Sequence, residues 1–312
     1  MTSPTAAEVI RARAASGSRD DGHRLMLVIE GGGSRGVYSS GMVQGLEELG
    51  LSGVFDAVYG TSAGAINGAW LLCGRAVPGM RSWSNPDIMR RVIDPARLMR
   101  GGAAFDVRYL VHRVYDGLEP MDFPAILDNP TTLHPIGTDV RTGNAIDLRP
   151  HIYDKRSLMR ALRASANLPI LAGGPIALDG VLYFDGGIAE PIPIHSAVRA
   201  GATHCLVLRT RRAGEPRPPA SRLHSVVGGN YLRLRAPGAY RAWLRRPEQE
   251  AAEERLLADL GDAALQIHPP ADSPTVDGTA RDTALLTTAL HHGRRAVHDA
   301  LGALVAGADS SS

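Results

Sequence analysis

One serine lies in a pattern that is typical of a catalytic nucleophile. The segment Gly60-Thr61-Ser62-Ala63-Gly64 matches G-x-S-x-G, a motif that holds its serine on a strained turn between a strand and a helix. A side chain in place of Gly60 or Gly64 would collide with the adjacent strand or helix. The residues before the motif are typical of a strand, and those after it are typical of a helix. We therefore predict that Ser62 is a nucleophile with an exposed hydroxyl at a helix N-terminus.

A glycine-rich loop lies upstream of this motif. Gly31, Gly32 and Gly33 follow an apolar run, and Arg35 and Gly36 come just after them, where a helical pattern begins. Consecutive glycines let bare backbone N–H groups converge on a negatively charged atom. The loop could therefore bind the phosphates of a nucleotide, or the oxyanion that forms when a serine attacks an ester carbonyl.

The two interpretations of this loop differ in their partner residues. Gly31, Gly33 and Gly36 fit the dinucleotide fingerprint G-x-G-x-x-G, and Asp56 has the spacing of the acid that binds a ribose hydroxyl. Arg35 inside the loop suits an oxyanion or a phosphate better than the tight turn of that fingerprint. Because the serine motif ends the next strand, both turns would lie at the carboxyl ends of adjacent parallel strands, where α/β sheets place their ligands. We therefore interpret the loop as an oxyanion hole.

A serine nucleophile needs a base to accept its proton. The ordinary hydrolase order is Ser…Asp/Glu…His, and His195 or His204 could complete it, although each is better explained as a structural or surface histidine. Asp185 ends the short apolar run VLYF and is followed by Gly186 and Gly187, so its carboxylate has room to project. An aspartate of ordinary pKa is a weak base, and it must therefore lie in a partly desolvated site in short contact with the serine hydroxyl.

The elements that must position these residues alternate between strands and helices. Apolar runs predict strands at 24–30 and 54–59, and helical patterns follow them at 36–49 and 65–72. Strand, turn and helix repeated twice is the signature of a parallel sheet covered by helices. The later predicted strands are 133–140, 145–148, 181–184 and 204–210, and the later predicted helices are 155–165, 193–200, 248–260 and 280–305. Between them, the proline-punctuated segment 75–130 is either a cap over a pocket or a plain crossover insertion.

Composition and charge exclude several classes of protein. The chain has 312 residues with a formal net charge of +2, so no strongly basic face is expected and we predict no nucleic-acid partner. Cys73 and Cys205 lie in apolar stretches and are expected to be buried free thiols. The N-terminus lacks a continuous apolar signal region, and no apolar run approaches the ~18 residues of a membrane span. We therefore expect a cytoplasmic protein that contacts lipid only at a membrane surface.

We expect one domain rather than two. Residues 1–23 are small, polar and charged and are predicted to be disordered, and the tail 306–312 is predicted to be frayed. Residues 24–305 would form a single α/β domain, whose part from 211 to 305 is helical and rich in arginine. Within that part, the stretch 231–246 interleaves apolar residues with arginines, and it either rests on an anionic membrane surface or packs on the protein body.

Taken together, the three motifs resemble those of the patatin-like phospholipase family. That family carries a G-G-G-x-R-G loop, a G-x-S-x-G elbow and a D-G-[AG] turn in this order, and here they stand as GGGSRG (31–36), GTSAG (60–64) and DGG (185–187). The stretches IGTDVRTG (136–143) and RASANLP (163–169) are also similar to those that the family has between the elbow and the aspartate. The family pattern usually has aspartate before the glycines, where this chain has Glu30.

The resemblance covers about residues 24–210 and implies a fold and an activity. It implies a three-layer α/β/α sandwich with a mainly parallel central sheet, and a dyad of Ser62 and Asp185 that works without histidine. It also implies a carboxylic ester hydrolase that acts on acyl esters of lipids, usually phospholipids, with no metal or other cofactor. Two alternatives stay open, namely a dinucleotide-binding enzyme that uses the 31–36 loop and a catalytically idle binding protein on the same fold. The sequence leaves the oligomeric state unknown.

Overall fold

The structure, a computed structural model, describes residues 3–215 and 231–306. Its strands form one sheet of eight strands in the order β5-β6-β3-β2-β1-β7-β8, with β4 paired to β3. They are β1 Leu25–Ile29, β2 Ala57–Thr61, β3 Thr132–Asp139, β4 Ala145–Asp147, β5 Ile176–Leu178, β6 Val181–Asp185, β7 His204–Leu208 and β8 Ala264–Ile267. Strands β3, β2, β1, β7 and β8 are mutually parallel, whereas β4, β5 and β6 form antiparallel pairs.

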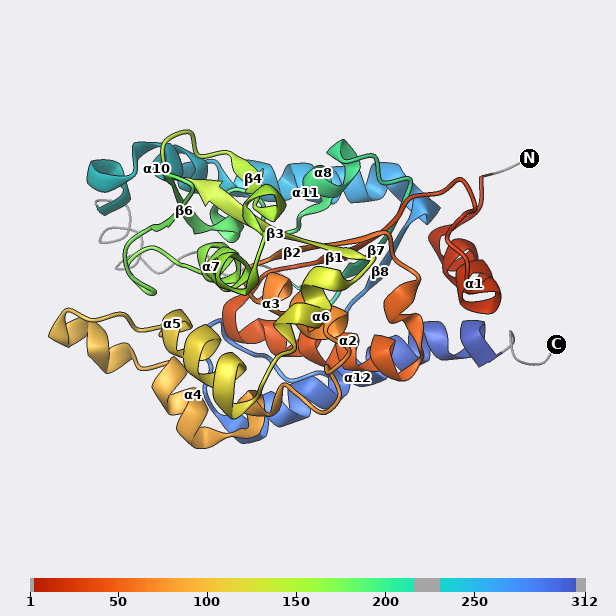
Figure 1. The fold of residues 1–312 in the computed structure, drawn as a ribbon, viewed down its shortest axis with the longest axis horizontal. Coiled ribbons are helices and arrows are strands. Elements are labelled where there is room, and N and C mark those ends of the chain that lie inside the picture. Colours follow the sequence, from red (N-terminus) through yellow and green to blue (C-terminus); the bar gives the residue numbers. More distant parts are fainter. Residues whose placement is uncertain (1–2, 216–230, 307–312) are drawn as a thin grey trace.

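Helices cover both faces of this sheet. They are α1 Ala6–Ser16, α2 Gly36–Glu48, α3 Ala63–Leu72, α4 Pro86–Val92, α5 Val107–Tyr109, α6 Phe123–Asp128, α7 Lys155–Ser165, α8 Ile194–Arg199, α10 Pro237–Leu244, α11 Arg246–Leu260 and α12 Thr283–Ala306. Helix α5 continues directly into a π-helix at Leu110–Leu118. Figure 1 shows α8, α10 and α11 on one side of the sheet and α2, α3 and α12 on the other. The predicted three-layer α/β/α fold with a mainly parallel sheet is confirmed.

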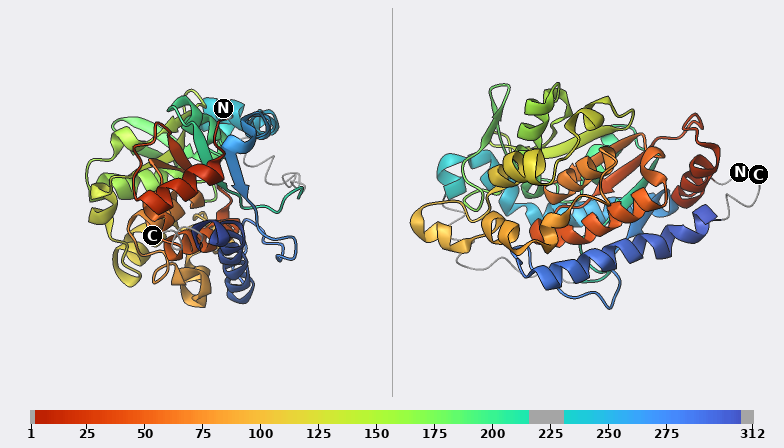
Figure 2. Two further views of the ribbon diagram at one scale, coloured as in Figure 1. Left: turned by 90° about the vertical axis from the view of Figure 1, so that its right-hand side faces the viewer. Right: turned by 60° about the horizontal axis from the view of Figure 1, so that its bottom comes forward.

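The two faces of β1 explain why this strand reads as an uninterrupted apolar run. Leu27 and Ile29 belong to the large core that packs under α2, α3 and α12, whereas Met26 and Val28 belong to a second core under α8 and α11. Every residue of β1 is buried, as expected for a parallel strand covered on both sides. Helix α12 makes its most extensive contact with α2, and Figure 2 shows the two helices running side by side.

The prediction that residues 1–23 are disordered was wrong for residues 6–16. Thr5 and Glu8 form a capping box at the start of α1, and Val9 and Ile10 on this helix are buried against the core. Arg13 is also buried, and its guanidinium pairs with the carboxylates of Asp21 and Asp56 at 2.8 and 2.9 Å. The part of this compensation that comes from Asp56, 43 residues away, is invisible to local composition. The single-domain organisation of 24–305 stays a prediction, and the predicted fraying of residues 307–312 lies outside the described residues.

The arginine-rich stretch 231–246 packs its apolar residues on the body of the protein. Leu232 is buried in a small core with Phe184 and Ile188, and the rings of Tyr240 and Trp243 pack against that core. Leu234 and Leu244 are the large apolar side chains of this stretch that stay exposed. The packing interpretation therefore accounts for most of its apolar residues.

Candidate active site

Ser62 lies on a sharp turn between β2 and α3. Its backbone has φ 57° and ψ −122°, a conformation that strains a residue with a side chain and costs ~1–3 kcal/mol. The neighbouring glycines make the turn sterically feasible. A Cβ atom on Gly60 would come within 2.6 Å of the Ala65 backbone, and one on Gly64 within 2.3 Å of the Ile29 carbonyl oxygen. The elbow therefore has the close packing that the sequence predicts at both glycines.

The side chains of Ser62 and Asp185 meet because two strands end at consecutive positions along β3. Thr61, the last residue of β2, lies opposite Ile136, and Asp185, the last residue of β6, lies opposite Gly137. Strand β4 pairs with the other edge of β3 at these positions, so β2 and β6 share one edge with their carboxyl ends facing each other. The Ser62 hydroxyl donates a hydrogen bond of 2.7 Å to Asp185 Oδ2.

The carboxylate of Asp185 is almost completely buried, with 2% of the residue exposed. Its other oxygen, Oδ1, accepts the backbone N–H of Gly187 at 2.7 Å, in the short turn that Gly186 begins. Burial raises the pKa of Asp185 to about 6, while the hydrogen bonds from Ser62 and Gly187 and the nearby charge of Arg246 act in the opposite direction. A raised pKa makes this carboxylate a stronger base than an exposed aspartate.

Neither histidine that could have completed a triad lines the two cavities that Ser62 borders. His204 begins β7 and lies opposite Leu25, at the amino end of β1, where its ring bonds the Pro4 carbonyl oxygen at 2.9 Å. His195 lies in α8. Within the described residues, neither histidine is hydrogen bonded to the serine or the aspartate.

The glycine loop presents fewer amides to the site than the sequence suggests. The backbone N–H groups of Gly31, Arg35 and Gly36 donate to carbonyl oxygens of the protein itself. Gly32 and Gly33 have no acceptor for their N–H groups within the described part of the chain. Both border the same cavity as the serine and the aspartate. Among the amides of the loop, these two are therefore the ones available to a ligand in that cavity, and the oxyanion hole itself stays a prediction.

The side chain of Arg35 supplies positive charge at the same place. Its Nε atom is buried and lacks a hydrogen-bond partner among the described residues. The residue borders a cavity that Arg211 and Arg246 also line. Burial, and then the charge of Arg211, lowers the pKa of Arg35 to about 10, so the group stays cationic at neutral pH. It can therefore stabilise negative charge on a ligand in this cavity.

The geometry does not favour the dinucleotide interpretation of the loop. Asp56, the predicted ribose ligand, accepts the backbone N–H of Leu25 at 2.7 Å and a hydrogen bond from Arg13 at 2.9 Å. Leu25 begins β1, whereas Gly31 follows the other end of this strand. Glu30, next to the loop, is buried and pairs with Arg209 at 3.1 Å. Asp56, the predicted ribose ligand, therefore lies at the opposite end of β1 from the glycines.

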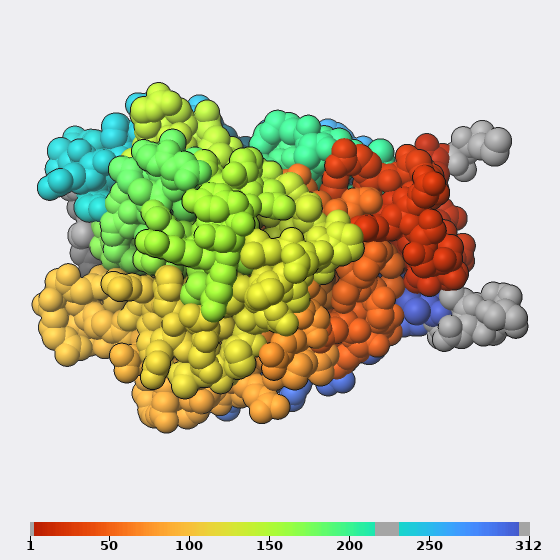
Figure 3. All heavy atoms as spheres, in the orientation of Figure 1, coloured from red at the N-terminus to blue at the C-terminus, as the bar shows by residue number. Residues whose placement is uncertain are grey.

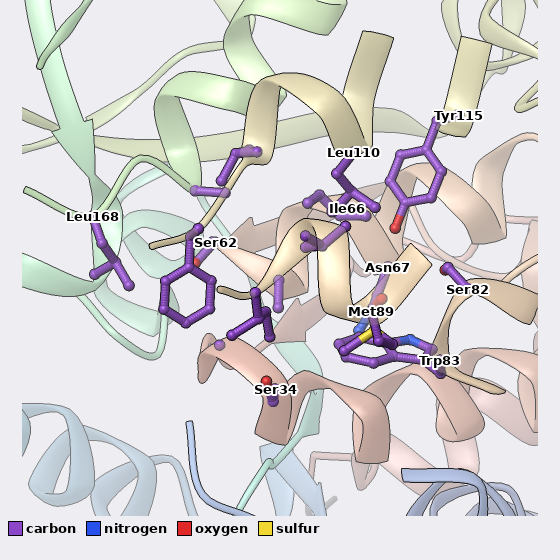
Figure 4. Close-up of a pocket in the computed structure, with 17 residues that line it drawn as sticks. Ser34, Ser62, Ile66, Asn67, Ser82, Trp83, Met89, Leu110, Tyr115 and Leu168 are labelled. Atoms are coloured by element: carbon purple, nitrogen blue, oxygen red, sulfur yellow. The ribbon is translucent and has the colours of Figure 1, made fainter. Parts of the chain in front are cut away.

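Two cavities of different character meet at Ser62. The first is apolar, has a volume of about 80 Å³ and is walled largely by Ile66, Trp83, Met89, Val92, Phe105, Val107, Leu110 and Leu168. Figure 4 shows Ser62 and Leu168 at one side of it and Trp83 and Tyr115 at the other. The second is mixed in character and has a volume of about 280 Å³; its charged lining comprises Glu30, Arg35, Asp185, Arg211, Arg246 and Glu250, beside the glycine loop and several apolar side chains. An ester bound across the serine would thus have an apolar compartment on one side and, on the other, a compartment lined by charged groups of both signs.

The proline-punctuated segment 75–130 contributes to the apolar cavity. Its α4, its α5 and its π-helix supply Met89, Val107 and Leu110 to the wall. Of the two interpretations that the sequence left open, the segment therefore acts as a wall over the cavity and not only as a crossover. Its apolar side chains explain how a chain poor in aromatic residues builds an apolar compartment.

The sequence did not predict two residues that position the backbone of Ser62 and Asp185. The hydroxyl of Ser165, at the end of α7, accepts the Ser62 backbone N–H at 3.0 Å and donates to the Ile136 carbonyl at 2.6 Å. The carbonyl of Asn167 accepts the Asp185 backbone N–H at 3.0 Å. Both lie in the RASANLP stretch, so its similarity to the family pattern was the signal that could have identified them.

Other candidate sites are few in the described residues. They contain no group of three or more His, Cys, Asp and Glu side chains arranged to hold a metal ion. None of their helices combines the length and the apolar character that a bilayer crossing requires. Cys73 and Cys205 are buried free thiols, as the sequence predicts.

Comparison with known proteins finds relatives in sequence and a solved structure that aligns with the chain. The chain is 30% identical over 191 residues to the uncharacterized protein YjjU of Escherichia coli, covering 60% of this chain and 52% of that protein. It is 31% identical over 194 residues to the human patatin-like phospholipase domain-containing protein 6, covering 58% of this chain and 13% of that protein. The solved structure of VipD from Legionella pneumophila aligns with a TM-score of 0.43 and 14% identity, over 90% of this chain and 67% of that one.

The chain spans about half the length of YjjU, the first of these curated relatives. A sequence model described as patatin-like phospholipase matches residues 27–198, which is more than half of the chain. This range includes the glycine loop, the serine elbow and the Asp185 turn. The chain therefore belongs to the patatin-like phospholipase family.

Proposed function

We propose that this protein is a serine hydrolase of lipid acyl esters, with Ser62 as the nucleophile and Asp185 as the general base. The observation that carries the proposal is the 2.7 Å hydrogen bond from the Ser62 hydroxyl to the buried Asp185 carboxylate, at the junction of two cavities. Membership of the patatin-like phospholipase family supports a lipid hydrolase in general. The dyad and the type of ester are the more specific parts of the proposal.

The first half of the reaction transfers the acyl group to the enzyme. Ser62 Oγ attacks the ester carbonyl carbon while Asp185 Oδ2 takes the hydroxyl proton. The carbonyl oxygen becomes an oxyanion, and the N–H groups of Gly32 and Gly33 stabilise it, with the Arg35 charge nearby. When the tetrahedral intermediate collapses, the bond to the leaving alkoxide breaks and that oxygen takes the proton from Asp185. The result is an acyl-serine and a free alcohol.

The second half of the reaction releases the acid. A water molecule attacks the acyl-serine carbonyl while Asp185 takes one of its protons. Collapse of the second tetrahedral intermediate breaks the bond to Ser62 Oγ, which regains its proton from Asp185. The apolar cavity behind Ile66 and Leu110 suits the acyl chain because it removes hydrocarbon from water.

The proposal is tested by hydrolysis of p-nitrophenyl acyl esters. Ser62→Ala and Asp185→Asn should each lower kcat/KM by at least about a thousandfold, as removal of one member of a catalytic unit does elsewhere. Ser84→Ala is the matched control, because Ser84 is exposed and its hydroxyl bonds only the Arg81 carbonyl oxygen. Circular dichroism establishes that each variant keeps its fold. Substantial hydrolysis by either site variant would refute the dyad.

A catalytically idle binding protein is the second candidate function. Such a protein would bind lipid in the same cavities but release no acid from any ester. A panel of acyl esters, phospholipids, lysophospholipids and thioesters, read out by released acid, separates this candidate from a hydrolase. The same panel identifies the preferred head group and acyl chain.

Contact with a membrane surface through residues 231–246 remains a prediction. Leu234 and Leu244 are exposed in this stretch and arginines surround them in the sequence, a pattern that favours anionic lipid surfaces. Sedimentation with anionic vesicles at low and high salt tests it. Replacement of both leucines by serine should reduce the bound fraction, and equal binding by that variant would contradict the prediction.

A further inference from the structure

A hollow lined by basic residues lies on the surface, apart from the cavities at Ser62. It opens to solvent, has a volume of about 460 Å³ and is lined by the side of β5 and by five basic residues, Arg108, His112, Arg156, Arg160 and Arg163. None of these residues lines either cavity at the serine. In Figure 3 the region of residues 107–118 borders the region of α7 and β5 on the facing surface.

Helical spacing brings the basic side chains together. Arg156, Arg160 and Arg163 lie at positions i, i+4 and i+7 of α7, so they share one face of that helix. Arg108 and His112 are likewise four residues apart, where α5 runs into the π-helix. The π-helix contacts α7, so the two basic faces line one hollow between them.

The arginines of this hollow are not paired with carboxylates. Among the described residues, none of the four forms an ion pair, and the hydrogen bonds that Arg160 and Arg163 make go to a backbone carbonyl and to His112. The nearby acids are engaged elsewhere. Asp116 pairs with Lys155 at 2.5 Å, and Asp106 accepts the Tyr109 backbone N–H at 2.8 Å.

This concentration of like charge is unfavourable as it stands. Burial, and then the charges of Arg108 and Arg160, lowers the pKa of Arg163. Burial, then Arg163 and Arg108, lowers the pKa of His112, with Asp116 opposing. Arg163 lies 3.3 Å from His112 Nε2, a contact that requires a neutral imidazole accepting the hydrogen bond. An anion in the hollow would relieve the repulsion among all these groups.

We propose that this hollow is a binding site for a phosphate group, either free or at the head of a lipid. Guanidinium groups bind phosphate oxygens through paired N–H donors, and several of them around one hollow can satisfy a tetrahedral dianion. The flexible, exposed side chains of Arg108 and Arg156 close on the phosphate from opposite sides. Arg160 and Arg163, which are partly buried, form its inner wall.

The position of the hollow links it to the candidate active site. Val107 and Leu110 line the apolar cavity, whereas Arg108 and His112, on the same helical segment, line the hollow. Helix α7 carries Arg163 and also Ser165, which holds the Ser62 backbone. A phosphate bound between the segment of Arg108 and His112 and helix α7 connects the wall of the apolar cavity to the helix that supports Ser62. This consequence rests on the proposed function, but binding of the phosphate does not.

The test is a titration with inorganic phosphate at constant ionic strength, balanced with sodium chloride. The full-length protein should show a saturable rise in Tm, and the apparent Kd should weaken at least about tenfold in Arg108→Gln/Arg156→Gln, because two of the four guanidiniums are lost. The side chains of these two arginines make no hydrogen bond or ion pair within the described residues, so the variant should fold. Arg255→Gln, an exposed arginine on α11, is the matched control and should bind phosphate as the wild type does.

A second measurement reports on the site directly. The C–H resonances of His112 should titrate at a higher pH in saturating phosphate than in chloride, since a nearby anion favours the imidazolium form. A phosphate response that is not saturable, or that is equal in the wild type and the double variant, overturns the proposal. Neither measurement depends on ester hydrolysis, so a negative result for phosphate binding is distinguishable from a negative result for the proposed function.

Vesicles distinguish the two sources of phosphate. If the ligand is a lipid headgroup, phosphatidylcholine vesicles that contain phosphatidic acid should bind the wild type and Arg255→Gln but bind Arg108→Gln/Arg156→Gln several-fold more weakly. If the ligand is a free phosphate, soluble phosphate alone should show that dependence on the two arginines. If neither vesicle binding nor soluble phosphate binding depends on Arg108 and Arg156, the proposed site is contradicted.

Discussion

The backbone N–H of Ser62 donates to the hydroxyl of Ser165, a residue 103 positions further along the chain, at a distance of 3.0 Å. The same hydroxyl donates to the Ile136 carbonyl in β3. One side chain thus joins the serine elbow, the neighbouring strand and the end of α7. Ser165 is a positioning residue, because its hydroxyl contacts the Ser62 backbone and not the reacting hydroxyl.

Replacement of Ser165 by alanine should therefore affect the elbow more than the binding of substrate. The variant leaves a buried N–H and a buried carbonyl without this partner, which should lower the free energy of unfolding by about 2 kcal/mol. Because the strained Ser62 turn loses a restraint, kcat should fall while KM changes little. Urea unfolding and p-nitrophenyl ester kinetics measure the two effects, with Ser84→Ala as the control. Unchanged stability and unchanged kcat would show that the contact has no positioning role.

The burial of Asp185 predicts how activity depends on pH. The raised pKa, about 6, means that the carboxylate form needed for proton abstraction predominates only above that pH. The kcat/KM of ester hydrolysis should therefore rise with pH through an apparent pKa near 6 and level off at neutral pH. A pH profile with p-nitrophenyl esters, corrected for uncatalysed hydrolysis, measures it. A profile that is already flat at pH values well below 6 would be inconsistent with this assignment of the base.

The same pKa has a consequence for stability, with a defined sign. The folded-state pKa of Asp185 lies above the ordinary aspartate value of 3.8, so the folded protein holds this proton more tightly than the unfolded chain does. Its contribution to stability is complete below about pH 4 and is lost as pH rises to about 6. Asp185→Asn has no such proton. As pH rises through this range, the free energy of unfolding of the variant minus that of the wild type should therefore increase by ~3 kcal/mol, at ~1.4 kcal/mol per pKa unit. Urea unfolding of both proteins at several pH values tests the difference, which a constant offset would contradict.

The apolar cavity predicts that the enzyme prefers esters with longer acyl chains. Substitution of a residue in the cavity wall should change that preference. Val107 lies on α5 and lines this cavity, and tryptophan in its place would fill part of the volume. Val107→Trp should lower kcat/KM for p-nitrophenyl octanoate by about tenfold or more relative to p-nitrophenyl acetate, since each lost methylene contact is worth ~1 kcal/mol. The acetate ester is the internal control for folding and chemistry. An equal effect on both esters would remove this cavity as the acyl compartment.

The fold and the main site were predictable because their signals are local. The uninterrupted apolar run of β1 and the glycines on either side of Ser62 indicate the parallel sheet and the elbow from a few residues each. The aspartate was predictable for the same reason, since Gly186 and Gly187 mark a turn directly after a strand. The order of the three motifs then identified the family.

The parts that escaped prediction depend on contacts between distant segments. Helix α1 does carry local signals, a capping box at Thr5 and Glu8 and Gly17 at its end, but the pairing of its buried Arg13 with Asp56 of a later segment shows in no local pattern. Strand β8 has only four residues, too few to show a period, and it is ordered by pairing with β7. The availability of the Gly32 and Gly33 amides depends on which other loop amides find acceptors in the protein. Such assignments require the tertiary structure.

The most direct test of the central claim is covalent labelling with a fluorophosphonate, followed by peptide mass spectrometry. The wild-type protein should be modified at Ser62, and Asp185→Asn should be modified there at least about a hundredfold more slowly, because general-base removal of the hydroxyl proton is lost. Labelling of the Asp185→Asn protein at the wild-type rate, or stable modification of another serine with Ser62 untouched, would contradict the claim.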